Sequence, residues 1–313
     1  MCAAETFALR RILCPTDFSE HSAAAVGVAV ELARLGHGQV RVLHVAPLVL
    51  PAGAFDLTCL PPRARGELLE ELRRCARPAE AAGVQVECLL REGDPADEVL
   101  RELESNRPDL VVMDRNIRGS VDRWILGSVT ERVVRHAAVP VLLVPPGFSL
   151  AAAGGPARVL CAVRLDDISK GTVAHAARLA SVLRAELVVL HVVDGLEREP
   201  WGGRSPVDVA EYRRIMAQEA SEQLDALAPD ALHPEGRVER RLATGVSHAQ
   251  ILDAARSIGA AFVVMGSHRH KLALGSTVRH VLRRSACPVL VAPSRASLAA
   301  ERTDEEREAA QKA

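Results

Sequence analysis

The chain has 313 residues, of which 39 are Lys or Arg and 40 are Asp or Glu, so its formal net charge is −1 at pH 7. This balance argues against a general nucleic-acid or membrane-surface binder, because both classes need a basic excess. Aromatic residues make up only 3% of the chain, which disfavours a stacking platform for single-stranded nucleic acid. The length is typical of two domains.

The sequence favours a cytoplasmic protein. Its N-terminus lacks the apolar segment of a secretory signal, and charged residues interrupt every apolar stretch, so we expect no membrane-spanning helix. The seven cysteines form no CxxC pair. Cys14 and Cys161 lie inside apolar runs and are predicted to be small buried hydrophobic residues in a reducing compartment.

In the first half, short β-branched runs alternate with longer helical patterns, an order typical of a parallel sheet covered by helices. Strands are predicted near 10–15, 39–45, 84–90, 109–113 and 139–144. Helices are predicted near 20–35, 66–82, 95–105 and 127–137. Asp94 precedes Pro95 and is expected to cap the third of these helices.

The second half repeats the pattern of the first. The segment Arg11–Asp17 aligns with Arg158–Arg164, and Val-Leu-His-Val occurs at 42–45 and again at 189–192. A long helix is expected near 206–227, and Ser247 begins a Ser-x-x-Gln capping box.

The repeat length indicates a duplicated domain rather than a solenoid. We predict a first domain at 1–147, a linker at 148–156, a second domain at 157–297 and a charged tail at 298–313. The predicted fold class is α/β, with two tandem doubly wound, Rossmann-like domains. Each domain is expected to hold a five-stranded parallel sheet with helices on both faces.

Ligands bind such sheets beyond the carboxyl ends of the strands. In the first copy Asp17 follows the first strand, where a carboxylate could accept hydrogen bonds from a ribose or a base amino group, while Ser19 is expected to cap the next helix. A loop is expected from Asp114 to Leu126, and Gly127-Ser128-Val129 then opens a helix whose amides could bind an anion.

These features resemble a tandem universal stress protein. The resemblance rests on Asp-x-Ser after the first strand, His-Val in the second, Val-Val-Met in the fourth, Gly-Ser before the last helix, and a final Pro-Val-Leu strand. It covers about 8–146 and 156–293, and implies a fold like that of adenine-nucleotide alpha hydrolases with ATP as ligand. No metal is expected beyond Mg²⁺ that accompanies a nucleotide. The nucleotide-binding positions that the resemblance implies are Asp17, Val45, Met113, Gly127, Ser128 and Val129 in the first copy, and Arg164, Val192, Met265, Gly266, Gly275 and Ser276 in the second.

The chain departs from the family's Gly-x2-Gly-x9-Gly-(Ser/Thr) loop in both copies. Asp114 and Ile117 occupy the first two glycine positions of the first copy. The second copy keeps Gly266 but has Arg269 at the next glycine, a loop four residues shorter, and Arg164 where the first copy has Asp17. A carboxylate at a phosphate position would weaken binding by repulsion.

Three accounts of these departures stay open. The first copy could still bind a nucleotide, the second could bind another small anion through Arg164, Arg269, Lys271 and Ser276, or both sites could be vestigial. We interpret the chain as a stress-response regulator with degenerate sites that acts through protein contact, with residual ATP or AMP sensing. The alternatives are genuine ATP binding with slow hydrolysis, or an anion site in the second domain.

The remaining motifs favour no enzyme. The sequence has no GxSxG elbow, Walker loop or HExxH motif. His44 and His191 are interpreted as structural rather than metal ligands, and the basic loop His268–Lys271 as a solvated turn. The resemblance also implies that the last strands, 139–144 and 287–292, pair within the chain, and a homodimer is conceivable.

Overall fold

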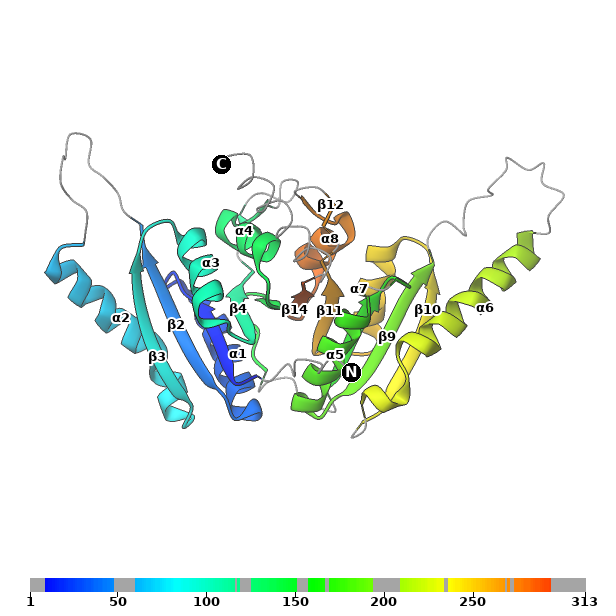
Figure 1. Cartoon of the computed structure of the whole chain (residues 1–313), viewed down its shortest axis with the longest axis horizontal. Helices are drawn as coiled ribbons and strands as arrows, with labels where there is room; N and C mark the ends of the chain where they lie inside the picture. The colour runs from blue at the N-terminus through cyan, green and yellow to red at the C-terminus, as the bar shows by residue number, and fades with distance from the viewer. Residues whose placement is uncertain are drawn as a thin grey trace, which may run out of the picture. The chain divides into compact units, whose positions relative to one another are not determined.

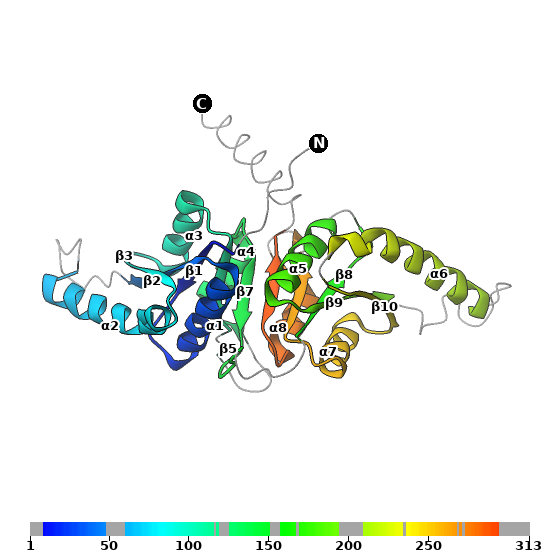
Figure 2. The same ribbon diagram turned by 90° about the horizontal axis from the view of Figure 1, so that it is seen from below.

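The computed structural model (Figures 1 and 2) describes residues 9–47, 60–115, 117–118, 125–150, 157–166, 169–193, 209–233, 236–267, 269–270 and 273–293. The chain divides into two compact units, Met1–Ala153 and Gly154–Ala313. The proposed linker falls largely outside the described residues, as do the tail and the side chains of the basic loop, so those boundaries stay predictions. Among the described residues, no helix is both long and apolar enough to cross a bilayer.

The first unit has a parallel sheet in the order β3-β2-β1-β4-β7. Helices α1 and α2 lie on one face and α3 and α4 on the other (Figure 2). The strands are β1 Arg11–Pro15, β2 Gln39–Ala46, β3 Gln85–Glu92, β4 Leu110–Asp114 and β7 Val141–Val144. The helices are α1 Glu20–Gly36, α2 Pro62–Ala81, α3 Pro95–Asn106 and α4 Ser128–His136.

The second unit repeats this arrangement in the order β10-β9-β8-β11-β14. Its strands are β8 Arg158–Val163, β9 Glu186–Val193, β10 Val238–Thr244, β11 Phe262–Gly266 and β14 Val289–Ala292. Its helices are α5 Ser169–Leu183, α6 Val209–Leu227, α7 Ser247–Ser257 and α8 Ser276–Arg284, with a 3-10 turn η1 at Asp230–Leu232. The predicted fold class is confirmed in both units.

Aliphatic side chains build the core, as the low aromatic content requires. Both faces of each central strand are buried, so β1 is closed to solvent at Ile12, Leu13 and Cys14, and β8 likewise at Cys161. On α1, Ala25, Ala29 and Ala33 are fully buried. Their small side chains let the helix approach the sheet closely, which positions the turn between β1 and α1 at the sheet's carboxyl edge.

Local details differ from the sequence-based expectation in two places. The loop expected from Asp114 to Leu126 contains a short antiparallel pair, β5 Ile117–Arg118 with β6 Ile125–Leu126, and β12 Arg269–His270 pairs likewise with β13 Ala273–Leu274.

The predicted capping box at Ser247 is wrong. Val246 is the N-cap residue, and its carbonyl accepts the first helical hydrogen bonds, from the amides of Ala249 and Gln250. Gly245, with φ 123°, separates the end of β10 at Thr244 from this N-cap. The Asp94 cap on α3 is confirmed, since its carboxylate accepts hydrogen bonds from the amides of Ala96 and Asp97 at 3.0 Å.

Candidate functional site

A cavity of about 870 Å³ opens at the carboxyl ends of β8, β9 and β11 in the second unit. The turn after β8 and helices α5, α6, α7 and α8 also contribute to its lining. All the site residues predicted for the second copy line this one cavity, namely Arg164, Val192, Met265, Gly266, Gly275 and Ser276. The volume lies within the range of small-molecule sites.

Arg164 enters the cavity from the turn after β8. Its backbone is held in place, because its carbonyl accepts a hydrogen bond from the Ser169 hydroxyl. Asp166 supports the same turn, with Oδ1 accepting from the Ser169 amide at 3.0 Å and from its hydroxyl at 2.8 Å. The Arg164 side chain is exposed and has no ion-pair partner among the described residues. A positioned guanidinium of this kind can bind a phosphate or carboxylate.

The first turn of α8 forms another part of the lining. Gly275 is the N-cap, with φ −54° and ψ 145°, and has no side chain to accept hydrogen bonds from the first helical amides. Ser276 to Arg279 follow along the cavity wall, and this turn contains no acidic residue. Amides without intrahelical partners, together with the helix dipole, favour an anion here.

The remaining lining is apolar on the sheet side and mixed on α6. Val192 and Met265 present the buried ends of β9 and β11 to the cavity. Residues 216, 219, 220 and 223 of α6 face it from one helical side. These α6 residues belong to none of the sequence motifs, and their i, i+3, i+4, i+7 spacing is the signal that could have indicated a shared face.

His44 and His191 have the structural role that the sequence analysis gave them. The Nδ1 atom of His44 lies 2.8 Å from the carbonyl oxygen of Thr16, and that of His191 lies 3.0 Å from that of Val163. Since a carbonyl only accepts, Nδ1 carries the proton and donates in both cases. Each imidazole thus braces the end of its unit's first strand. Among the described residues, no group of His, Cys, Asp or Glu could hold a metal ion.

In the first unit, Asp17 is already engaged by its own turn. Its Oδ1 accepts hydrogen bonds from the Ser19 amide at 3.0 Å and from the Ser19 hydroxyl at 2.5 Å. The Ser19 hydroxyl oxygen accepts from the Ser22 amide, so Ser19 caps α1 as expected. Partial burial acts to raise the pKa of Asp17, but the hydrogen bonds from Ser19 outweigh it and leave the pKa below its usual value.

The neighbouring Phe18 fixes the same turn. It adopts φ 65°, an uncommon value for a bulky residue. Its ring stacks on His44 with the centroids 4.0 Å apart, and its amide donates to the Thr16 hydroxyl at 3.1 Å. The predicted site residues Val45 and Met113 lie at the ends of β2 and β4 and are almost fully buried. Asp17, Val45 and Met113 therefore lie together at the carboxyl ends of the parallel strands.

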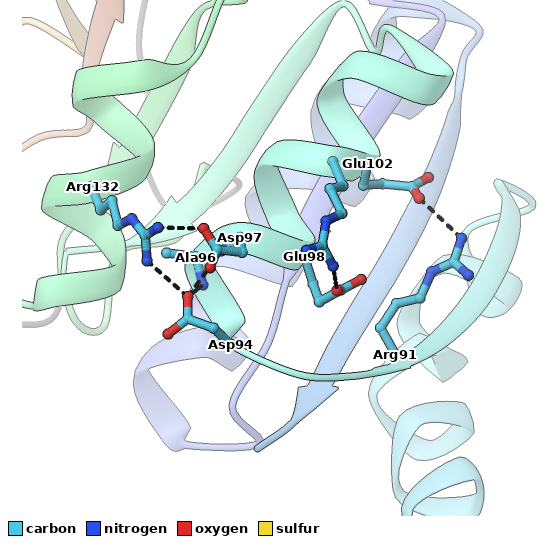
Figure 3. Close-up of polar contacts among 8 residues, drawn as sticks. Arg91, Asp94, Ala96, Asp97, Glu98, Glu102 and Arg132 are labelled. Carbon is cyan, nitrogen blue, oxygen red and sulfur yellow. Dashed lines mark hydrogen bonds and ion pairs between the residues drawn. The ribbon is translucent and has the colours of Figure 1, made fainter. Parts of the chain in front are cut away.

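The first turn of α4 is acidic, unlike that of α8. Gly127 is the N-cap, Ser128 and Val129 follow, and Glu131 lies in the first turn. Arg132 turns away to contact Asp94, with Nη1 at 2.9 Å from Oδ1, and also contacts Asp97 at the start of α3 (Figure 3). Arg132 is thus paired with carboxylates of its own unit.

Comparison with known proteins gives the chain's relatives. The sequence model of the universal stress protein family matches residues 8–145 and 156–293. A universal stress protein of Methanocaldococcus jannaschii is 34% identical over 43% of this chain and 81% of its own length. One of Mycolicibacterium smegmatis is 27% identical over 90% of this chain and 96% of its own.

Solved structures similar to this chain include two universal stress proteins. The crystal structure of a universal stress protein from Archaeoglobus fulgidus matches 92% of this chain and 99% of its own, with a TM-score of 0.65 and 24% identity. A universal stress protein solved in complex with cAMP matches 44% of this chain and 98% of its own, with a TM-score of 0.36 and 23% identity.

Proposed function

The chain belongs to the universal stress protein family, and from that premise we propose that it is a regulator that binds an adenine nucleotide in its second unit. The first unit holds a degenerate counterpart of the same site. On this proposal the chain transmits the occupied or empty state of the cavity to a protein partner by contact.

One observation carries the proposal: charge differs between the two copies at three aligned positions. The first unit has Asp17, Asp114 and Glu131. The second unit has Arg164, Gly266 and Arg279 at these positions, and all three line the 870 Å³ cavity. Each of these three replacements removes a carboxylate, and two of them add a guanidinium, so all three favour an anionic ligand in the second unit. Asp166, which stands where the first unit has Ser19, adds one carboxylate to the lining, and it accepts hydrogen bonds from Ser169.

The lining of the cavity supports a ligand with both an apolar and an anionic part. Val192 and Met265 offer apolar surface for a base, while Ser276 and the amides after Gly275 offer donors for a phosphate. Gly266, at the end of β11, lets a phosphate approach the backbone more closely than a side chain would. Mg²⁺ would accompany the phosphates rather than occupy a protein site of its own.

We propose binding rather than turnover as the activity. The sequence has none of the hydrolase or phosphoryl-transfer motifs that place a nucleophile beside a base. Slow ATP hydrolysis is the alternative, and phosphate release measured with Mg²⁺ present distinguishes the two.

Calorimetric titration of the full chain with AMP and with ATP tests the proposal. We expect one nucleotide per chain. Gly266→Asp, which introduces the carboxylate of the first unit, should weaken binding by roughly 10-fold or more through like-charge repulsion. The matched variant Asp114→Gly should leave the affinity unchanged. Absence of binding, or an effect of Asp114→Gly alone, would contradict the proposal.

A further inference from the structure

We propose that Arg164 makes the second unit selective for a nucleotide that carries a phosphoryl group on its ribose as well as one at its 5′ position. This inference rests on the proposed function and specifies the ligand class of the same cavity. It follows from the exposed side chain of Arg164 at the cavity and from a second group of anion-binding residues in that cavity, the first turn of α8. We call these two groups the anion-binding walls of the cavity.

Exchange of Asp17 for Arg164 inverts the hydrogen-bonding character of the turn after the first strand. A carboxylate accepts hydrogen bonds and suits the hydroxyls of an unmodified ribose, as in dinucleotide sites where an acidic residue binds the 2′-hydroxyl. A guanidinium only donates and is always charged. In the dinucleotide sites that take a phosphate on the ribose, an arginine nearby accommodates it.

The structure leaves Arg164 available for that contact. Its side chain is exposed at the cavity and forms no ion pair within the described parts of the chain. Two acidic residues also line the cavity. Asp166 already accepts two hydrogen bonds from Ser169, and Glu219 stands across the cavity on α6. By contrast, Asp17 in the first unit is engaged by Ser19.

Two anion-binding walls of the cavity come from different strands. Strand β8 pairs with β11, with Ala162 in register with Met265. Arg164 follows β8, whereas Ser276 and Arg279 belong to the helix that follows β11. Arg164 and the first turn of α8 thus offer hydrogen-bond donors from two elements of the fold. Phosphates at two separate positions of one nucleoside can satisfy both, and the cavity volume accommodates a ligand of that size.

Calorimetry with ligands of matched phosphate content tests this inference on the full chain. ADP carries two phosphates in one chain, and adenosine 3′,5′-bisphosphate and its 2′,5′ isomer carry them at two positions. We expect one of the bisphosphates to bind roughly 10- to 100-fold more tightly than ADP or AMP, the range of a charge-assisted bidentate contact.

Arg164→Asp should abolish this preference, because it should weaken the binding of the bisphosphates more than that of AMP. Arg184→Asp makes the same charge change at an exposed residue beyond the end of α5, away from the cavity lining, and should keep the preference. AMP binding without preference for a bisphosphate would overturn the inference and leave the proposed function intact. No binding of any nucleotide would overturn both. Circular dichroism of each variant confirms that it is folded.

Discussion

The carboxylate of Asp17 and the guanidinium of Arg164 occupy aligned positions, yet their surroundings differ in kind. Asp17 accepts two hydrogen bonds from Ser19 and helps fix the start of α1. Arg164 contributes only its backbone carbonyl to the corresponding turn, where Ser169 binds it, and its side chain reaches the cavity. A position that supports the fold in one unit is therefore free for a ligand in the other.

This role of Asp17 predicts a pH-dependent loss of stability. Because its pKa is lowered in the folded chain, its contribution is fully present above the usual carboxyl pKa and is lost as the pH falls through the folded value. Asp17→Asn should cost about 1 kcal/mol at pH 7. Below about pH 4 the difference in free energy of unfolding between the variant and the parent chain should shrink. Denaturant unfolding at pH 7 and at pH 3 measures both, and an equal gap at the two pH values would refute this role.

The buried cysteines give a second prediction at this scale. Burial raises the pKa of the Cys14 and Cys161 thiols well above the usual value. Since the thiolate is the nucleophile, neither should react with iodoacetamide at pH 8 while the chain is folded. Both should react in denaturant, as peptide mass spectrometry can show. Labelling of either residue in the folded chain, at the rate of the unfolded one, would contradict this.

The aligned helix pairs α3–α4 and α7–α8 are held by different chemistry. In the first unit Arg132 bridges Asp94 and Asp97 (Figure 3). In the second unit His280 stands at the position of Arg132, and its ring stacks on His248 with the centroids 4.4 Å apart. On α4, Arg132 forms ion pairs with residues at the start of α3, whereas Arg279 of α8 lines the cavity.

Loss of the Arg132 contacts should therefore be measurable in unfolding. Arg132→Ala should lower the free energy of unfolding by about 1 kcal/mol, since two half-exposed ion pairs are lost, and by less in high salt. Arg135→Ala on the same helix is the control, because Arg135 has no ion pair among the described residues. Equal effects of the two variants would contradict the role given to Arg132.

The extent of prediction from sequence differs between elements. Strands and helices near the repeated motifs were predictable because burial of both faces imposes apolar runs, as in β1 and β11. The α6 contribution to the cavity was not, because the spacing of Met216, Glu219 and Gln223 indicates a shared helical face but not that this face lines a cavity, which depends on tertiary packing. The Ser247 cap was wrong because the N-cap directly follows a positive-φ glycine in both units, Asp94 after Gly93 and Val246 after Gly245, which makes Ser247 the first helical residue.

At the scale of the whole molecule, the same arrangement of five parallel strands around an aliphatic core occurs in each unit. The division into two units is visible in the repeat, but the boundaries at 147, 157 and 297 stay predictions. So does the pairing of the last strands, because the repeat alone does not set how two domains associate.

Limited proteolysis tests the proposed linker at 148–156. Its Ala-, Gly- and Pro-rich composition predicts an early cut there, with two resistant fragments of similar size. Mass spectrometry of the first products locates the cut. Resistance of this segment, with first cuts inside either predicted domain, would contradict the boundaries.

The central claim is that the second unit holds the nucleotide and the first does not. Hydrogen–deuterium exchange of the full chain, with and without saturating AMP, tests where the ligand binds. We predict slower exchange in 164–172 and 275–280, with 17–25 and 127–132 unchanged. Slower exchange in the first unit's segments instead, or no change in either unit, would contradict the account.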